Sequence, residues 1–187
     1  MSTVENLKLE LAYHSQRGIT FIMAASVYWA CLGLAGIFFD PRVAFTISIW
    51  GTGILFPISI LLAKLMRINI FFKNDLSPMG IWANVFQLFL FPVFFISAKA
   101  NIYFPPIFMG VLAGAHFVFY HWLYKSKTYL ALAFIISISS YILGYLYLEK
   151  SYSVIGLSNA GWLMLGSVGL AFENINQSTS TPQVINN

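Results

Sequence analysis

Three polar side chains within long apolar stretches are the residues of this sequence best suited to do chemistry. Asn84 and Gln87 are three residues apart, so they share one face of a helix. His116 lies in the next apolar stretch, and a turn near Asn101 would bring it to the depth of Gln87 in an antiparallel helix pair. Buried imidazole and amide groups predict a polar pocket or solute path in which His116 forms hydrogen bonds or responds to protons. The alternative interpretation is that the three groups only form hydrogen bonds between helices.

The sequence lacks the residue groupings that hydrolytic and ion-coupled mechanisms need. The apolar stretches contain no Asp, Glu, Lys or Arg, although proton-driven transporters and ion pumps usually bury an acidic residue. No His-Glu-x-x-His motif, P-loop or Gly-x-Ser-x-Gly elbow occurs. The single cysteine, Cys31, allows neither an intrachain disulfide nor a cysteine-based metal site. A membrane enzyme that uses His116 and His121 would have no carboxylate to complete its site, so we expect no enzymatic activity, no cofactor and no metal.

Small residues and prolines indicate how the helices pack. Gly110 and Gly114 form a Gly-x-x-x-Gly motif on the fourth apolar stretch, which predicts close packing of a neighbouring helix. Pro57 and Pro92 lie inside the second and third stretches, where each removes a backbone hydrogen bond and should kink its helix. Indole N–H groups need partners, so we expect three tryptophans placed away from the stretch ends to face the interior: Trp29, Trp50 and Trp162.

The composition places these stretches in a membrane. The chain has 187 residues, of which 59% are hydrophobic and 9% charged, and its mean hydropathy is +0.77. Ordinary soluble domains carry about 25% charged residues, because a surface that faces water needs them. The aromatic content of 18% also excludes a disordered chain. The formal net charge of +4 comes from basic residues scattered singly along the chain, so we expect no nucleic acid partner.

The ten basic and six acidic residues divide the chain into six charge-free stretches of more than 20 residues. About 20 helical residues cross the ~30 Å hydrocarbon core of a bilayer. Continuously apolar runs favour helices over the alternating strands of a barrel. We therefore predict an all-α fold, a polytopic integral membrane bundle of six transmembrane helices. The predicted helices are Gly18–Phe39, Val43–Ala63, Leu76–Ala98, Ala100–Tyr124, Thr128–Leu148 and Ser151–Phe172.

The sequence predicts three regions along the chain. Residues 1–17 form a cytoplasmic amphipathic N-terminal segment, residues 18–172 the transmembrane domain, and residues 173–187 a disordered cytoplasmic tail rich in Ser, Thr, Gln and Asn. Ser2 and Glu5 have the spacing of a capping box, which would start a helix near the N-terminus. Two interpretations of this helix stay open, because it could lie on the membrane surface or extend the first span.

The distribution of basic residues predicts the orientation in the cell membrane. One side of the six-helix topology carries seven Lys and Arg residues, and the other side carries three, namely Arg42, Lys99 and Lys150. Loops that stay in the cytoplasm are enriched in Lys and Arg, so both termini are expected to be cytoplasmic. The seven residues are Lys8, Arg17, Lys64, Arg67, Lys73, Lys125 and Lys127.

Three segments of the sequence carry a resemblance to a known family. The strings LKLELAY, GILFPISILLAKL and GAHFVFYHWLY resemble a family of small bacterial polytopic membrane proteins of unknown function. The likeness extends from the amphipathic N-terminus to the fifth span. It implies a bacterial inner or plasma membrane as the location, and it supplies no catalytic or binding residue.

Two functional hypotheses follow from these features. The first is a small transporter or channel for a neutral or weakly basic solute, with a site formed by His116, Gln87 and Asn84 between the third and fourth spans. The second is a non-transporting accessory or scaffold protein that packs against a partner through Gly110 and Gly114 of the fourth span. The expected partners are the lipid bilayer and either a second copy of the chain or another membrane protein.

Overall fold

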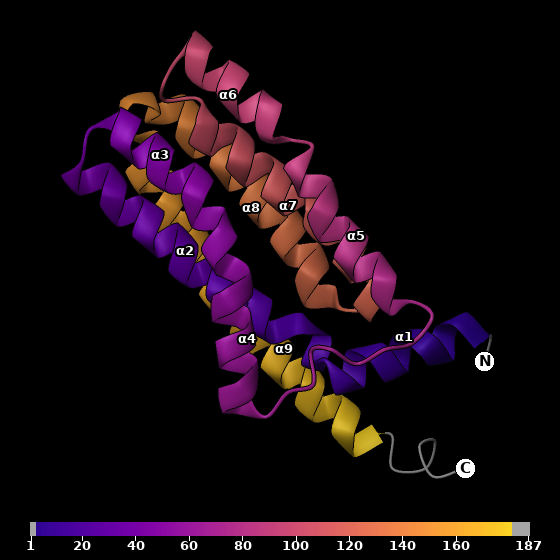
Figure 1. Ribbon diagram of the computed structural model, residues 1–187. Coiled ribbons are helices and arrows are strands. Elements are labelled where there is room, and N and C mark those ends of the chain that lie inside the picture. The colour runs from indigo at the N-terminus through magenta and orange to yellow at the C-terminus, as the bar shows by residue number, and fades with distance from the viewer. Residues whose placement is uncertain (1–2, 181–187) are drawn as a thin grey trace.

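A computed structural model describes residues 3–180, with the side chains described as far as Asn176 (Figure 1). Within these residues the chain is helical and has no strand, which confirms the predicted all-α fold. Ser2 of the predicted capping box lies outside the described residues. The helices are α1 (Thr3–His14), η1 (Gln16–Gly18), α2 (Ile19–Phe38), α3 (Pro41–Gly51), η2 (Thr52–Ile54), α4 (Leu55–Met66), α5 (Ser77–Leu88), α6 (Phe91–Ala100), α7 (Pro105–Tyr124), α8 (Lys127–Leu146), η3 (Leu148–Lys150) and α9 (Ser151–Ser180).

Six helical stretches of the described chain are long and apolar enough to cross a membrane. Their number and order are those predicted from the charge-free stretches. Four of them are built around one long helix each, namely α2, α7, α8 and α9, and the other two combine shorter helices. The six stretches are Gln16–Phe38, Pro41–Met66, Ser77–Ala100, Pro105–Tyr124, Lys127–Leu146 and Leu148–Asn176.

The second and third stretches are interrupted, as their prolines predicted. The second consists of α3 and α4 joined by the 3₁₀ turn η2, and Pro57 lies in the first turn of α4. The third consists of α5 and α6, with Pro92 at the start of α6. Proline has no N–H and its ring clashes with the preceding turn, so the α-helical hydrogen-bond ladder stops just before each proline.

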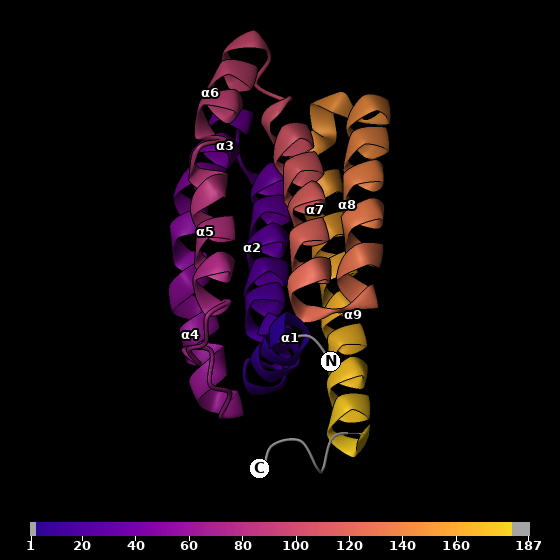
Figure 2. The ribbon, with the colours of Figure 1, turned by 90° about the vertical axis from the view of Figure 1, so that its right-hand side faces the viewer.

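Four long helices form the packed part of the molecule. α2 packs along α9, and α7 packs along α8, with α8 and α9 also in contact. The interrupted stretches α3–α4 and α5–α6 lie on one side of these four helices (Figure 2). Buried residues make up 39% of the α2 and α9 stretches but only 11% of α3–α4 and 6% of α5–α6. The interrupted stretches are therefore attached to a closely packed four-helix frame.

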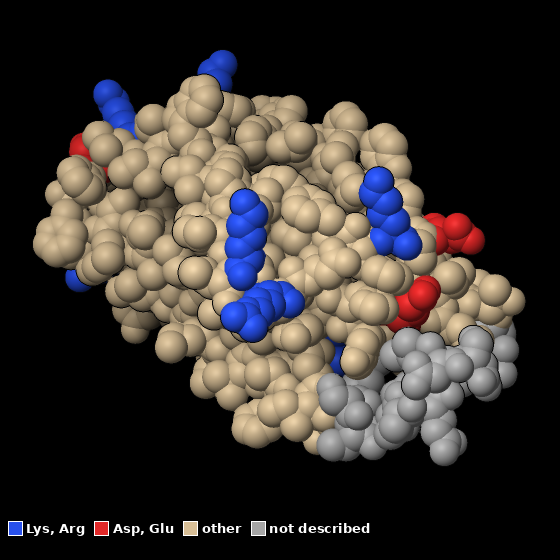
Figure 3. Space-filling view, turned by 60° about the horizontal axis from the view of Figure 1, so that its bottom comes forward, with Lys and Arg blue, Asp and Glu red and all other residues tan. Residues whose placement is uncertain are grey.

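Both ends of the described chain lie at the same end of the bundle (Figure 1). α1 runs across this end, and the α4–α5 loop and the α7–α8 turn lie there too (Figures 1 and 2). We call it the basic end, because it carries the seven Lys and Arg residues counted above. Figure 3 looks toward it and shows Lys and Arg side chains projecting from the surface.

Two sequence-based expectations differ from the structure. Trp50 was expected to face the interior but is 77% exposed on α3, because no neighbouring helix covers that face of the interrupted span. The tail from Glu173 was expected to be disordered, whereas α9 continues as a helix to Ser180. Glu173 and Asn174 bind other elements of the basic end, and these bonds extend the helix beyond its apolar part. Residues 181–187 of the predicted tail lie outside the described residues.

Candidate functional site

His116 lies on α7 at the contact with α5. Its ring packs edge-on against Tyr120, with 4.7 Å between the ring centroids. Both ring nitrogens are buried and neither has a partner of full hydrogen-bond geometry among the described residues, although the backbone of Ala83 on α5 interacts with the ring. An enclosed imidazole without a well-formed hydrogen bond keeps donor and acceptor capacity for a further group.

The two amides of α5 are placed differently from the expectation. Asn84 is exposed, and its Nδ2 donates a hydrogen bond of 3.0 Å to the carbonyl of Gly80 in its own helix. The hydroxyl of Tyr120 donates to the same carbonyl at 3.4 Å. Gln87 is half-buried. The third and fourth spans are therefore neighbours, but among the described residues no hydrogen bond joins Asn84 or Gln87 to His116 across them.

The Gly110–Gly114 face of α7 is covered by α8 of the same chain. A Cβ atom at Gly110 would lie 2.6 Å from the Cβ of Ser140, and one at Gly114 would lie 2.7 Å from the backbone nitrogen of Ser137. Ser140 is fully buried and hydrogen-bonds Asn159 of α9, with 3.1–3.2 Å between the polar atoms. These glycines hold α7, α8 and α9 together, so this face is not open to a partner.

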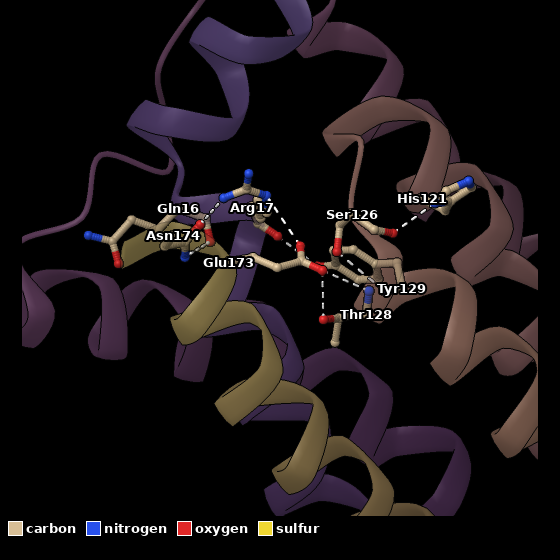
Figure 4. Close-up of polar contacts among 8 residues, drawn as sticks. All are labelled: Gln16, Arg17, His121, Ser126, Thr128, Tyr129, Glu173 and Asn174. Carbon is tan, nitrogen blue, oxygen red and sulfur yellow. Dashed lines mark hydrogen bonds and ion pairs between the residues drawn. The ribbon is translucent and has the colours of Figure 1, made fainter. Parts of the chain in front are cut away.

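A partly buried network at the basic end was not predicted from the sequence. Arg17 of η1 forms an ion pair with Glu173 of α9, with 3.5 Å between Nε and Oε2 (Figure 4). The other oxygen of Glu173 accepts hydrogen bonds of 2.9 Å from the N–H and the hydroxyl of Thr128, at the start of α8. The Arg17 guanidinium also donates to the side-chain oxygen of Asn174. The network ties the entrance of α2 to α8 and α9.

The same network stabilises an unusual backbone turn between α1 and α2. Gln16, Arg17 and Gly18 have φ angles of 46°, 53° and 67°, in the left-handed region. Such a conformation costs a non-glycine residue about 1–2 kcal/mol. Two side chains bind the turn, because Tyr129 donates to the carbonyl of Arg17 at 2.7 Å and Asn174 donates to that of Gln16 at 3.1 Å. The turn separates α1 from α2, so α1 is not a straight extension of the first span.

α1 is fixed to the basic end by charged and polar contacts. Lys8 is 6% exposed, and its Nζ lies 3.8 Å from the centroid of the Trp122 ring. Glu5 forms ion pairs with Lys8 and with Lys125. The hydrogen bond and charge of Lys125 lower the pKa of the Glu5 carboxyl below its ordinary value. The side-chain amide of Asn74 in the α4–α5 loop donates a hydrogen bond of 2.9 Å to the carbonyl of Leu7.

Two hollows on the described surface are lined by residues other than the three predicted for the polar pocket. The first, of about 450 Å³, lies at the basic end between α1, the end of α4 and α9, and we call it the basic-end hollow. The second, of about 550 Å³, is an apolar groove between α8 and α9. His116, Gln87 and Asn84 line neither. The basic-end hollow is lined by Tyr13, His14, Gln16, Ile19, Met66, Arg67, Ile68, Asn69, Ala171, Asn174 and Ile175.

The comparisons with known proteins identify a family but no function. Within residues 3–180, no group of three or more His, Cys, Asp or Glu side chains could hold a metal ion. No curated protein and no solved structure matches the chain. The model of one family, described as a family of unknown function (DUF7010), matches residues 4–173. This match covers nearly the whole sequence, and the chain therefore belongs to the DUF7010 family of unknown function.

Proposed function

We propose that this chain is a six-span cell-membrane protein with cytoplasmic termini that transports a small neutral or weakly basic solute. The observation that carries the proposal is the pair of interrupted spans. Interrupted helices near the membrane midplane form the solute sites of many transporters, because unwound backbone offers polar groups to the solute. Irregular backbone at this depth is tolerated where it is covered by protein or lines a cavity.

The two interruptions lie at matched depths. α4 and α5 each have 12 residues and are joined by the loop at the basic end, so both breaks lie one 12-residue helix away from that loop. Pro57 and Pro92 cannot donate to the carbonyls of Gly53 and Leu88, the residues four positions before them. Without these α-helical bonds, the two carbonyls would have acceptor capacity for a solute that carries N–H or O–H groups.

His116 supports a neutral or weakly basic solute. It lies on α7, against which α5 packs, and its buried nitrogens have no partner of full hydrogen-bond geometry in the described chain. A neutral imidazole offers one donor and one acceptor. The six spans carry no acidic side chain near their midpoints that would favour a strongly charged cation. Gln87, one turn from the break in α5–α6, would supply a further amide.

The surface through which a scaffold protein was expected to bind its partner is covered by a helix of the same chain. Its partner was expected at Gly110 and Gly114, where α8 packs within this chain. No other feature of the described surface favours it over transport.

The proposed orientation rests on the basic end. Seven of the ten Lys and Arg residues belong to the end at which both described chain ends lie, and such an excess marks the cytoplasmic side. Fusion of alkaline phosphatase, active only outside the cytoplasm, after the C-terminus tests this. We expect an inactive fusion there and an active one in the α2–α3 turn, and the reverse pattern would overturn the orientation.

Transport is tested by swelling of proteoliposomes that contain the purified full-length protein. The solutes are glycerol and urea as neutral probes and ammonium and methylammonium chloride as weakly basic ones. We expect uptake of at least one class above protein-free vesicles, reduced in His116→Ala and in Gln87→Ala. His121→Ala is the matched control, because the His121 ring already pairs with the carbonyl of Ser126 at 2.7 Å. Uptake equal to that of empty vesicles for every solute would refute the proposal.

A further inference from the structure

The basic-end hollow is a cup at one end of the bundle whose walls come from segments far apart in the sequence. Tyr13, His14 and Gln16 belong to the α1–α2 region, Met66 to Asn69 to the end of α4 and the loop after it, and Ala171, Asn174 and Ile175 to α9. Its volume of about 450 Å³ falls in the range of about 300–1,000 Å³ typical of small-molecule sites. The hollow lies where the first, second and last spans end, at the depth at which lipid headgroups meet water.

The polar part of the hollow suits an anion. Its lining includes Arg67 and contains no Asp or Glu. Arg67 forms no ion pair with any residue from 3 to 176, so its guanidinium is uncompensated there. The amides of Gln16 and Asn69 line the same hollow and add N–H donors. Guanidinium and amide donors grouped without a carboxylate match phosphate oxygens in charge and in hydrogen bonding.

The charge of the neighbouring Arg17 does not change the net positive charge of the hollow. Arg17 is not among the residues that line the hollow, and it forms an ion pair with Glu173. The Asn174 side chain is already engaged with Arg17 and with the Gln16 carbonyl, so it forms a fixed wall (Figure 4). The free positive charge of the hollow is that of Arg67.

The remaining walls are apolar. Ile19, Ile68 and Ile175 form them together with the small side chain of Ala171 and with Met66. A purely inorganic anion would leave these surfaces without a partner, whereas a ligand with a hydrocarbon part would cover them. The lining therefore selects a molecule that joins an anionic head to an apolar body.

We propose that the basic-end hollow binds a phosphate ester that carries an apolar part, with Arg67, Gln16 and Asn69 on the phosphate and the isoleucines on the hydrocarbon. Two sources present this chemistry at the basic end. One is the headgroup of an anionic phospholipid of the surrounding leaflet, and the other is a soluble organic phosphate. The site is separate from the solute path proposed above, and its test measures binding rather than transport.

The experiment uses the full-length protein purified in a neutral detergent. In the lipid arm, native mass spectrometry follows retention of dioleoyl phosphatidylglycerol against dioleoyl phosphatidylcholine. In the soluble arm, glycerol 3-phosphate is titrated while the melting temperature is recorded. We expect preferential retention of phosphatidylglycerol, weakened about tenfold or more in Arg67→Gln, because a hydrogen-bonded charge contributes at least this much. Arg67→Lys keeps the charge and should retain most of the binding.

Two controls separate the site from general attraction to a basic surface. Lys64→Gln removes the charge of an exposed α4 residue that does not line the hollow, and it should leave binding unchanged. Ala171→Leu fills the apolar wall without changing charge and should weaken binding, whereas Ala131→Leu, at an exposed position of α8, should not. A response to glycerol 3-phosphate alone, lost in Arg67→Gln, would assign the soluble source. Equal weakening by Lys64→Gln and Arg67→Gln, or no binding in either arm, would overturn the proposal.

Discussion

The contact between α2 and α9 leaves no room for a side chain at Gly156. A Cβ atom there would lie 2.5 Å from both the Cα and the nitrogen of Gly33 and 3.0 Å from the carbonyl oxygen of Trp29. Carbon atoms in favourable contact are about 3.5–4.0 Å apart. Because the opposing atoms are backbone, no rotamer change can relieve the overlap, and the two helices must separate by roughly 1 Å.

We therefore expect Gly156→Ala to lower the free energy of unfolding by about 1–3 kcal/mol, the usual cost of overpacking. Gly161, five residues further along the same helix, is the matched control, because nothing lies within 4 Å of the Cβ it would gain. Gly161→Ala should be neutral or stabilising by up to about 1 kcal/mol, since alanine is the better helix former. The same substitution is thus expected to act with opposite sign at two positions of α9.

The assay is unfolding of both variants in mixed detergent micelles titrated with dodecyl sulfate and followed by far-UV circular dichroism. The midpoint of Gly156→Ala should fall below that of the wild-type chain, and that of Gly161→Ala should not. A Gly156→Ala midpoint at or above wild type would show that α2 and α9 are not in backbone contact. Equal loss at both positions would point to a general effect of glycine replacement in α9.

Three further predictions concern polar contacts. Glu173→Gln leaves the buried Arg17 guanidinium without its counter-charge and should lower the free energy of unfolding by about 3 kcal/mol, measured by the same titration. Adding Arg17→Gln to this variant should recover part of the lost stability. Fully additive losses from the two substitutions would contradict the pairing. Because the folded-state pKa of Glu5 is lowered, its contribution to α1 docking is present above its ordinary pKa of 4.5 and lost as the pH falls through the lowered value. Hydrogen exchange of α1 should therefore speed up on acidification below that value, and an equal change in Glu5→Gln would contradict this origin. Asn159→Ala should cost about 1 kcal/mol in the same titration, with little further loss when Ser140→Ala is added, and additive losses would rule out the Ser140–Asn159 bond as the cause.

The spans and their interruptions could be predicted because each depends on local sequence. Crossing a bilayer requires about 20 consecutive apolar residues, so the position of charges alone defined the six stretches. A proline removes its own hydrogen bond whatever its surroundings, so Pro57 and Pro92 marked the two breaks. The Gly110–Gly114 motif likewise indicated a close helix contact, although not that its partner is α8 of the same chain.

The rotation of each helix about its axis could not be predicted in the same way. Sequence spacing placed Asn84, Gln87 and His116 at similar depths, but packing decides which way each face turns. α5 has few neighbours, so Asn84 is exposed and bonds its own helix, whereas α7 is covered and encloses His116. Trp50 was misjudged for the same reason, since nothing covers its face of α3.

The Arg17–Glu173 pair shows a different limit of sequence analysis. The two residues are 156 positions apart and both stand at the outer limits of apolar stretches, where a charge is ordinarily solvated. The two residues share only their position in the sequence, because each flanks an apolar stretch that ends at the basic end of the bundle. The pair became visible only once α2 and α9 lay side by side, and it explains why α9 stays helical beyond the predicted span.

The buried network and the basic-end hollow share two residues, which couples them physically. Gln16 and Asn174 line the hollow, and Asn174 also binds Arg17 and the Gln16 carbonyl. A ligand that binds only when this wall is formed stabilises the left-handed turn by mass action. By reciprocity, a substitution that releases the turn must weaken binding of the ligand. Glu173→Gln, which lies outside the lining, should therefore weaken retention of phosphatidylglycerol, whereas Asn159→Ala, which removes a polar contact of α9 between α8 and α9, should not.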